Sequence, residues 1–426
     1  MRILWLSNVD LCNTNPSTSG TWIYSMNNAL RSYTDVEVCA NITYTAQGIP
    51  HMKTDGVRND YYIPNSYLKR NGTPKEEAIN YVSEIIQRER PDLIHIWGTE
   101  KGWGLMISNH YKESIPCLLE IQGLSFFVAE ERFYGGISNH VIRKMRGLVE
   151  FIYPQSRLEA VKKKMQQWGE IEIPMIQSYR FVNTQSEWVR QLIYWISKDV
   201  MTYKTGIILR DSFMKSPLWS SVHKRAKTPV LFTTTSPIPY KGLHTTLKAF
   251  SLVLKEFPTA CLRVAGVGVH NVLWKDNGYI KYLRKECVRL NIENNVHFLG
   301  KLDEKRLMTE MYNADVFVIS SYVESYCLAL AEALSLGMPC VAPFTSAITE
   351  LIDNEVNGLL YPQSDYYVYA YKIITLLRDE NKTEVLGNKA SVIQRKKSDS
   401  YILSNNQVRI YNDILCKFHE KKNTVI

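Results

Sequence analysis

The sequence predicts an α/β protein with two doubly wound parallel sheets and C-terminal helices. Its 426 residues exceed what one hydrophobic core usually organises. In both halves of the chain, short apolar runs of strand length alternate with longer segments of helical period. Residues 211–228 lack a sustained period and separate the two halves, so we expect them to form a linker.

In the first half, the chain opens with a short apolar run that breaks at Ser7 and Asn8. This run has one basic residue and no visible cleavage site, so it predicts a first strand rather than a signal peptide. Changes of period then place the following elements. Strands are expected at 2–6, 36–45, 93–96 and 117–121, and helices at 21–33, 75–87 and 184–196.

The second half alternates more regularly and then becomes helical from residue 365 onward. Strands are expected at 230–234, 261–265, 296–299, 316–319 and 339–342, and helices at 243–255, 280–290, 304–312 and 326–336. We therefore expect domains over 1–215 and 216–400, with a helix at 401–426 that packs back on the N-terminal domain. Ligands of such sheets bind at the carboxyl ends of the strands, here in a central cleft that the two domains face.

Composition favours a soluble, cytoplasmic protein, with 45% hydrophobic and 22% charged residues and no long uncharged apolar run. The formal charge of +9 suits acidic partners such as phosphates, nucleic acid or anionic lipid. Much of the excess lies at 141–167, where basic and apolar residues mix. This segment predicts either peripheral contact with a membrane or an ordinary solvated helical face.

The sequence gives no motif for a metal or a cofactor. The eight cysteines are scattered, without C-x-x-C spacing or a neighbouring histidine pair. No D-x-D motif stands at a matching place. We therefore expect neither a metal nor a cofactor, and mostly reduced, buried cysteines.

The most informative segment is 316–362, where a strand, an acidic loop and a helix follow one another. If the helix opens near Ser325, the backbone amides of Tyr326, Cys327 and Leu328 can seat a phosphate. Glu324 beside that seat would repel the anion, so it is better aimed at sugar hydroxyls. Glu332, two turns into the helix, could hold ribose hydroxyls.

The pair Glu324-x7-Glu332, with the Gly337-Met338-Pro339 stop after it, resembles the signature of the retaining glycosyltransferases of family four, which have the GT-B fold. The resemblance covers most of the chain, most strongly 229–362. It continues in the segments 262–268, 296–300, 345–350 and 357–360.

This resemblance implies roles for several residues. In the family, the first glutamate contacts the donor sugar and the second contacts the ribose. Lys241 matches the lysine that pairs with the donor diphosphate. The family usually has an arginine shortly before it, where this chain has Thr235 and Ser236. The resemblance also places further residues at the donor site, which are Ser325, Tyr326, Cys327, Leu328, Gly266 and Gly300.

The first domain shows weaker signals. Gly20 is the best match to the glycine-rich loop of the family, and His95 lies on a strand end where the family has a histidine. Gln122 stands where the family commonly places a histidine that bonds the donor sugar. An amide can donate and accept hydrogen bonds but cannot shuttle a proton near neutral pH.

These features predict a retaining glycosyltransferase, with a UDP-sugar favoured over a GDP-sugar as donor. The acceptor would be a glycan or a polyprenyl-diphosphate-linked glycan, as in bacterial surface polysaccharide synthesis. Gln122 and the missing arginine leave open a sugar-nucleotide-binding protein without catalysis. Nucleic-acid binding does not explain the acidic loop at Glu324, and the chain has no aromatic RNA-binding motif.

Overall fold

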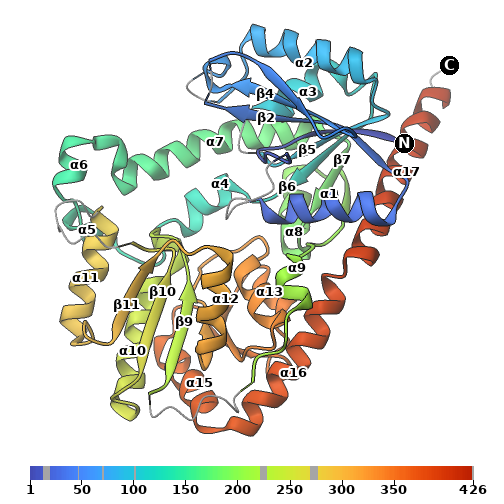
Figure 1. Ribbon diagram of the computed structural model, residues 1–426. Coiled ribbons are helices and arrows are strands. Elements are labelled where there is room, and N and C mark those ends of the chain that lie inside the picture. Colours follow the sequence, from blue (N-terminus) through green and yellow to red (C-terminus); the bar gives the residue numbers. More distant parts are fainter. Residues whose placement is uncertain are drawn as a thin grey trace. The chain divides into compact units, whose positions relative to one another are not determined.

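The structure is a computed structural model that describes residues 1–12, 20–46, 48–69, 72–99, 102–220, 228–268 and 277–424. Contacts divide the chain into two units, each with its own sheet (Figure 1). The first unit comprises Met1–Phe126, Gln166–Arg210 and Ser398–Ile426, and the second comprises Phe127–Met165 and Asp211–Lys397.

This division differs from a single boundary near residue 215. Phe127–Met165 belongs to the second unit although the chain on both sides of it belongs to the first. The reason is packing, because Ile142 and Met145 lie in the same buried cluster as Leu243 and Leu283. Periodicity in a sequence indicates a helix but does not indicate which core the helix joins.

The first unit contains an eight-stranded sheet of order β3-β4-β2-β1-β5-β6-β7-β8. All neighbouring strands pair in parallel except β3, an edge strand that the sequence did not indicate and that pairs antiparallel with β4. The strands are β1 Arg2–Leu6, β2 Glu37–Thr45, β3 His51–Thr54, β4 Asn59–Pro64, β5 Leu93–Trp97, β6 Cys117–Ile121, β7 Phe181–Thr184 and β8 Met201–Lys204.

Helices α1 and α17 pack together on one face of this sheet. Their apolar residues, including Ile23, Leu30 and Ile414, share a buried cluster with Ile3 and Leu118 of the strands. The C-terminal helix is therefore part of the first unit. The helices along this part of the chain are α1 Thr21–Tyr33, α2 Glu76–Glu89, α3 Trp103–Tyr111, α4 Ser125–Phe127, α7 Leu158–Ser178, α8 Glu187–Ile196 and α17 Ser400–Thr424.

The second unit contains a six-stranded sheet of order β11-β10-β9-β12-β13-β14, with parallel pairing throughout. The predicted strands all form, and β14 is an additional one. The strands are β9 Val230–Thr234, β10 Cys261–Ala265, β11 Val296–Gly300, β12 Val316–Val318, β13 Cys340–Phe344 and β14 Leu359–Pro362.

Helices α10, α11 and α15 share one buried cluster with the strands of this sheet. From β9 to β11 the chain adds strands toward one edge of the sheet, and from β12 onward it adds them toward the other edge. The right-handed crossover rule therefore places α12 and α13 on the opposite face. The helices of this unit are α5 Asn139–Lys144, α6 Leu148–Ile152, α9 Asp211–Lys215, α10 Leu243–Glu256, α11 Gly278–Leu290, α12 Glu304–Asn313, α13 Leu328–Ser335, α14 Ile348–Leu351, α15 Tyr366–Arg378 and α16 Glu380–Lys397.

Each sheet has one point at which the direction of winding reverses. In the second unit the reversal lies between the neighbouring strands β9 and β12, and in the first unit between β1 and β5. The loops that leave the carboxyl ends of two such strands diverge to opposite faces and open a crevice between them. The sites are therefore expected at these loops.

Candidate active site

Lys241 lies in the loop that leaves β9, at the end of a short 3-10 turn, Pro239–Lys241. Gly242 then begins α10 with a positive φ of 72°. A Cβ atom at residue 242 would come within 1.9 Å of the carbonyl oxygen of Ser320, so only glycine fits here. Ser320 follows β12, and this close approach brings the loops after β9 and β12 into contact.

Glu324 lies in the loop after β12, and its carboxylate pairs with Lys241. The distance from Lys241 Nζ to Glu324 Oε1 is 2.7 Å. The two side chains are 24% and 11% exposed, so the pair is partly open to solvent. Burial disfavours the charged ammonium, but the Glu324 carboxylate outweighs it and raises the pKa of Lys241 above its ordinary value. Lys241 is therefore a fixed cation at the strand ends.

The helix after Glu324 begins later than the sequence suggested. Cys327 is the N-cap, with a φ of 78°, and α13 starts at Leu328. The first helical amides are therefore those of Leu328, Ala329 and Leu330, so the helix starts two residues later than predicted. A role of Tyr326 and Cys327 at a phosphate stays a prediction. A turn in the left-handed region ends the loop two residues later than the apolar pattern alone indicates.

Glu332 lies on α13 and is only 3% exposed. Its role toward a ribose stays a prediction. Gly266 and Gly300 lie at the carboxyl ends of β10 and β11, the edge that also carries the loop after β9. Gly266 N donates to the carbonyl oxygen of Gly300 at 2.7 Å, and Thr235 N donates to Ala265 O at 3.0 Å. Lys241, Glu324 and both glycines thus belong to one edge of one sheet.

The segment inserted from Phe127–Met165 contacts the turn that carries Lys241. His244 Nε2 lies 2.9 Å from the carbonyl oxygen of Gly135, and the ring of Phe133 lies 6.3 Å from that of Tyr240. Gly135 has a φ of 55°, and a Cβ atom there would approach Pro239 O to 2.3 Å. Sequence analysis missed this contact, because nothing local in the sequence links residue 135 to residue 239.

His95 does not lie at the surface of the first unit. Its side chain is fully buried, with Nδ1 2.8 Å from the hydroxyl of Tyr411 and Nε2 3.5 Å from a carboxylate oxygen of Glu120. The ring stacks on Trp97, and burial lowers its pKa. Side chains alternate along a strand, and His95 points into the face that α17 covers. The structure thus gives His95 a place in the core and no contact with solvent.

Gln122 and Gly20 lie at ends of elements in the first unit. Gln122 follows β6 and is half-buried. Gly20 is the N-cap of α1, and its carbonyl oxygen accepts the amide of Ile23. Residues 13–19, which precede Gly20 in the expected glycine-rich loop, lie outside the described residues.

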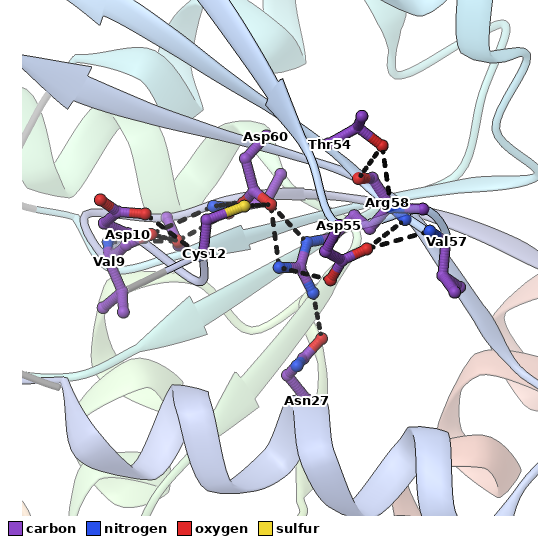
Figure 2. A network of polar contacts seen from close by, with 12 residues as sticks. Val9, Asp10, Cys12, Asn27, Thr54, Asp55, Val57, Arg58 and Asp60 are labelled. Carbon is purple, nitrogen blue, oxygen red and sulfur yellow. Dashed lines mark hydrogen bonds and ion pairs between the residues drawn. The ribbon is translucent and has the colours of Figure 1, made fainter. Parts of the chain in front are cut away.

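A buried polar network fixes the start of the loop after β1, and Figure 2 shows its members. The guanidinium of Arg58 pairs with Asp60, with 2.8 Å between Nη2 and Oδ2, and both side chains are fully buried. Arg58 Nη1 also donates to Asn27 of α1 at 2.8 Å, and Cys12 Sγ donates to Asp60 Oδ2 at 2.9 Å. Sequence analysis missed this network, since the strand β4 that carries it was not predicted.

A small pocket lies near the carboxyl ends of β5, β6 and β7 in the first unit. Asn183 Nδ2 donates to Glu120 Oε2 at 2.6 Å and to Thr205 Oγ1 at 2.8 Å. Within the described part of the chain, the indole nitrogen of Trp97 and the amide nitrogen of Gln407 are buried without a hydrogen-bond partner. The lining comprises Trp22, Met26, Trp97, Glu120, Asn183, Thr205, Gly206, Ile207, Ile208 and Gln407.

Over the described ranges, no group of three or more His, Cys, Asp or Glu side chains is placed to hold a metal ion. No helix in the described part combines the length and apolar character needed to span a bilayer.

The loops after β9 and β12 lie inside a segment that matches a known family. Residues 218–392 match the family model for glycosyl transferases group 1. The match covers less than half of the chain, so it shows what this segment is similar to. The segment contains both members of the Lys241–Glu324 pair, together with Gly266, Gly300 and Glu332.

Curated relatives resemble part of the chain. The chain is 33% identical over 128 residues to N-acetyl-alpha-D-glucosaminyl L-malate synthase of Bacillus anthracis, covering 30% of this chain and 32% of the relative. It is 28% identical over 166 residues to poly(glycerol-phosphate) alpha-glucosyltransferase of Bacillus subtilis, covering 39% of this chain and 23% of the relative. The alignments thus span about a third or less of these relatives.

Solved structures resemble the whole chain. Sucrose-phosphate synthase from Thermosynechococcus elongatus gives a TM-score of 0.73 at 17% identity, covering 98% of this chain and 100% of that one. HepE from Anabaena in complex with UDP and glucose gives 0.64 at 16% identity, covering 97% and 99%. At such identities the similarity shows the fold, which is GT-B with two parallel-sheet α/β units and C-terminal helices.

Proposed function

We propose that the protein is a retaining glycosyltransferase that moves a sugar from a nucleotide diphosphate to a glycan or polyprenyl-diphosphate-linked glycan acceptor. The observation that carries the proposal is the contact of 2.7 Å between Lys241 and Glu324 where the second sheet reverses its winding. A cation there suits a diphosphate, and a carboxylate suits sugar hydroxyls. The match of residues 218–392 to group 1 glycosyl transferases supports this assignment.

A UDP-sugar is the favoured donor. Structural neighbours that bind UDP or UDP-glucose support UDP over GDP. Lys241 would neutralise the diphosphate, with the positive end of α13 beside it. Glu324 would grip the sugar and Glu332 the ribose. Glu324 then needs to part from Lys241, or share it, when the donor arrives.

The reaction would need no nucleophile from the protein. The acceptor hydroxyl oxygen would bond to the anomeric carbon on the face that the diphosphate leaves, as the bond from that carbon to the phosphate oxygen breaks. The hydroxyl proton would pass to the leaving diphosphate. Lys241 and the helix dipole would stabilise the negative charge that develops there.

The acceptor would bind to the first unit. The small pocket at the ends of β5 to β7 is not that site, because Trp97, Glu120 and Asn183 are at most 5% exposed and Asn183 already bonds to Glu120. Gln122, close along the chain to Glu120, would add a neutral hydrogen bond.

The proposed setting is bacterial surface polysaccharide synthesis at the inner face of the membrane, with peripheral contact through 141–167. Relatives named for poly(glycerol-phosphate) glucosylation in Bacillus subtilis and as CapJ in Staphylococcus aureus support this setting. The basic and apolar residues of 141–167 support the membrane contact.

Calorimetry with UDP and GDP, paired with a donor-turnover assay on a mixture of glycan acceptors, tests the proposal. We expect binding of UDP over GDP and turnover that depends on acceptor. Lys241→Ala should weaken UDP binding by roughly 30-fold or more, because a charge-assisted contact with the diphosphate is lost. Absence of binding to either nucleotide would refute a glycosyltransferase site.

The second candidate is a sugar-nucleotide-binding protein without catalysis, which Gln122 and the Thr235–Ser236 positions favour. It predicts that UDP or a UDP-sugar binds while no acceptor in the mixture leads to donor loss. Turnover with any acceptor excludes it.

A further inference from the structure

Helix α6 and the residue after it expose an unusual run of large apolar side chains. Leu148, Phe151, Ile152 and Tyr153 are 60%, 79%, 60% and 56% exposed. Single exposed apolar residues are common on soluble proteins, but four within the six residues 148–153 form a patch. We refer to these four residues as the α6 patch.

The opposite side of α6 is polar and firmly held. Glu150 is only 3% exposed, and its carboxylate accepts the backbone amides of Gly147, at 2.9 Å, and of Gly278. Gly278 begins α11, whose positive end stabilises the carboxylate. Arg157 Nε donates to the carbonyl oxygen of Glu150 at 3.0 Å, which fixes the segment after α6.

This arrangement reverses the usual amphipathic helix. The charged residue of α6 faces the protein, and the apolar residues face outward. Rotating α6 to bury Phe151 would break both hydrogen bonds of the Glu150 carboxylate. The α6 patch is therefore held outward by its anchor, and its exposure in water is unfavourable unless an apolar phase receives it.

Exposed cations precede and follow the patch along the chain. Arg143 and Lys144 end α5, and Lys163 and Lys164 lie in the second turn of α7. Arg146 Nη2 bonds to Glu159 Oε1 at 2.6 Å, which holds the first turn of α7 beside the junction of α5 and α6.

The local charge is therefore positive. Residues 141–167 contain seven Lys and Arg but only two Glu. One glutamate is the buried anchor and the other pairs with Arg146, so neither is left to balance the exposed lysines. An anionic partner is indicated.

We propose that the α6 patch inserts into the interface of an anionic membrane, with the lysines and arginines of α5 and α7 contacting lipid headgroups. Exposed apolar side chains flanked along the chain by basic residues suit the headgroup and acyl boundary of a bilayer. This inference names the surface for the membrane contact proposed above and rests on that contact, but it does not depend on glycosyl transfer.

The test is co-sedimentation of the purified full chain with vesicles. Wild type should sediment with vesicles of phosphatidylglycerol and phosphatidylcholine and remain in solution with phosphatidylcholine alone, and added salt should weaken binding. The variant Phe151→Ser/Ile152→Ser should bind at least about tenfold more weakly, because two insertable side chains are lost. Lys163→Gln/Lys164→Gln should also bind more weakly.

Tyr371→Ser is the matched control, since Tyr371 is 66% exposed on α15 of the same unit. It should bind like wild type. Each variant should keep the circular dichroism and the UDP affinity of wild type, which separates failure of this inference from failure of the proposed function. Equal binding of wild type and Phe151→Ser/Ile152→Ser would overturn the inference. So would absence of vesicle binding, including a case in which the patch instead mediates self-association.

Discussion

Two of the ion pairs in this molecule, each between a basic side chain and a carboxylate, lie in very different surroundings. Arg58 and Asp60 in the first unit are fully buried, and Asn27, Cys12 and Asn41 bond to the same two side chains. Lys241 and Glu324 in the second unit are partly exposed at the ends of two strands. The first pair is enclosed by protein groups, whereas the second presents a cation and a carboxylate that a ligand can reach.

The comparison separates a structural from a functional use of charge. A fully buried pair holds backbone segments together, and removing one partner leaves a buried charge. A pair that is partly open to solvent can also exchange its partner for a ligand. The Lys241–Glu324 pair therefore makes sense mainly through what binds to it, and Arg58–Asp60 through what it anchors.

The largest expected effect is on the buried pair. Arg58→Met should lower the stability of the first unit by about 3 to 5 kcal/mol, because Asp60 would stay buried without its cation. Urea unfolding followed by circular dichroism measures this loss. Arg190→Met removes an exposed cation from a pair with Glu187 and should leave the unfolding curve unchanged. An equal loss of stability in the two variants would mean that burial of the ion pair does not decide its contribution to stability.

Glu324→Gln should act on turnover rather than on folding. The amide keeps the size of the side chain but loses the charge aimed at the donor sugar, so transfer should fall by about 10² to 10³. UDP binding should stay nearly intact or tighten, since Lys241 is released from its partner. Single-turnover transfer assays and calorimetry measure the two quantities. Full transfer activity in this variant would remove Glu324 from the mechanism.

The two regions also differ in how far their sequences predicted them. Strands β9 and β10 formed with the expected bounds, and the contact of Lys241 with Glu324 followed the expected strand and helix order. That segment contains local signals for its helix ends, which are a glycine before α10 and the Gly337-Met338-Pro339 stop after α13. Such local signals fix loops, and sheet topology then brings the loops together.

The failures have a different physical origin. His95 was expected at a site because it is near a strand end, but which face a strand residue takes depends on packing against α17, far along the chain. The anchoring of Phe127–Met165 in the second unit likewise depends on distant contacts. The direction of a side chain and the hydrophobic core that a segment joins depend on tertiary contacts, which local sequence patterns do not indicate.

His244 offers a pH test in the second unit. Burial lowers the pKa of His244 from 6.5 to about 4, so the folded protein keeps it neutral. As the pH falls from 6.5 to 4, His244 takes up a proton in the unfolded chain but not in the folded protein. The free energy of unfolding should therefore decrease over this range by up to about 3 kcal/mol. His244→Gln should remove that part of the acid sensitivity, measured as the change in Tm between pH 7 and pH 5. An unchanged slope would mean that His244 does not titrate on unfolding.

Some acid sensitivity should remain in this variant. Burial also lowers the pKa of His95 in the first unit, so that residue contributes with the same sign. A glutamine at residue 244 can still donate to Gly135 O and accept from the Tyr279 hydroxyl, which keeps the packing of the neutral state.

Gly135→Ala tests whether the inserted segment positions Lys241. Alanine at a φ of 55° costs roughly 1 kcal/mol, and its Cβ would clash with the backbone oxygen of Pro239, so the turn before Lys241 must shift. We expect about tenfold weaker UDP binding by calorimetry, with the fold retained. Gly56→Ala is the matched control, because residue 56 has a φ of 86° and nothing within 4 Å of an added Cβ. If both variants bind UDP like wild type, the contact of Gly135 with Pro239 has no part in placing the lysine, and the exposed pair depends on its own sheet alone.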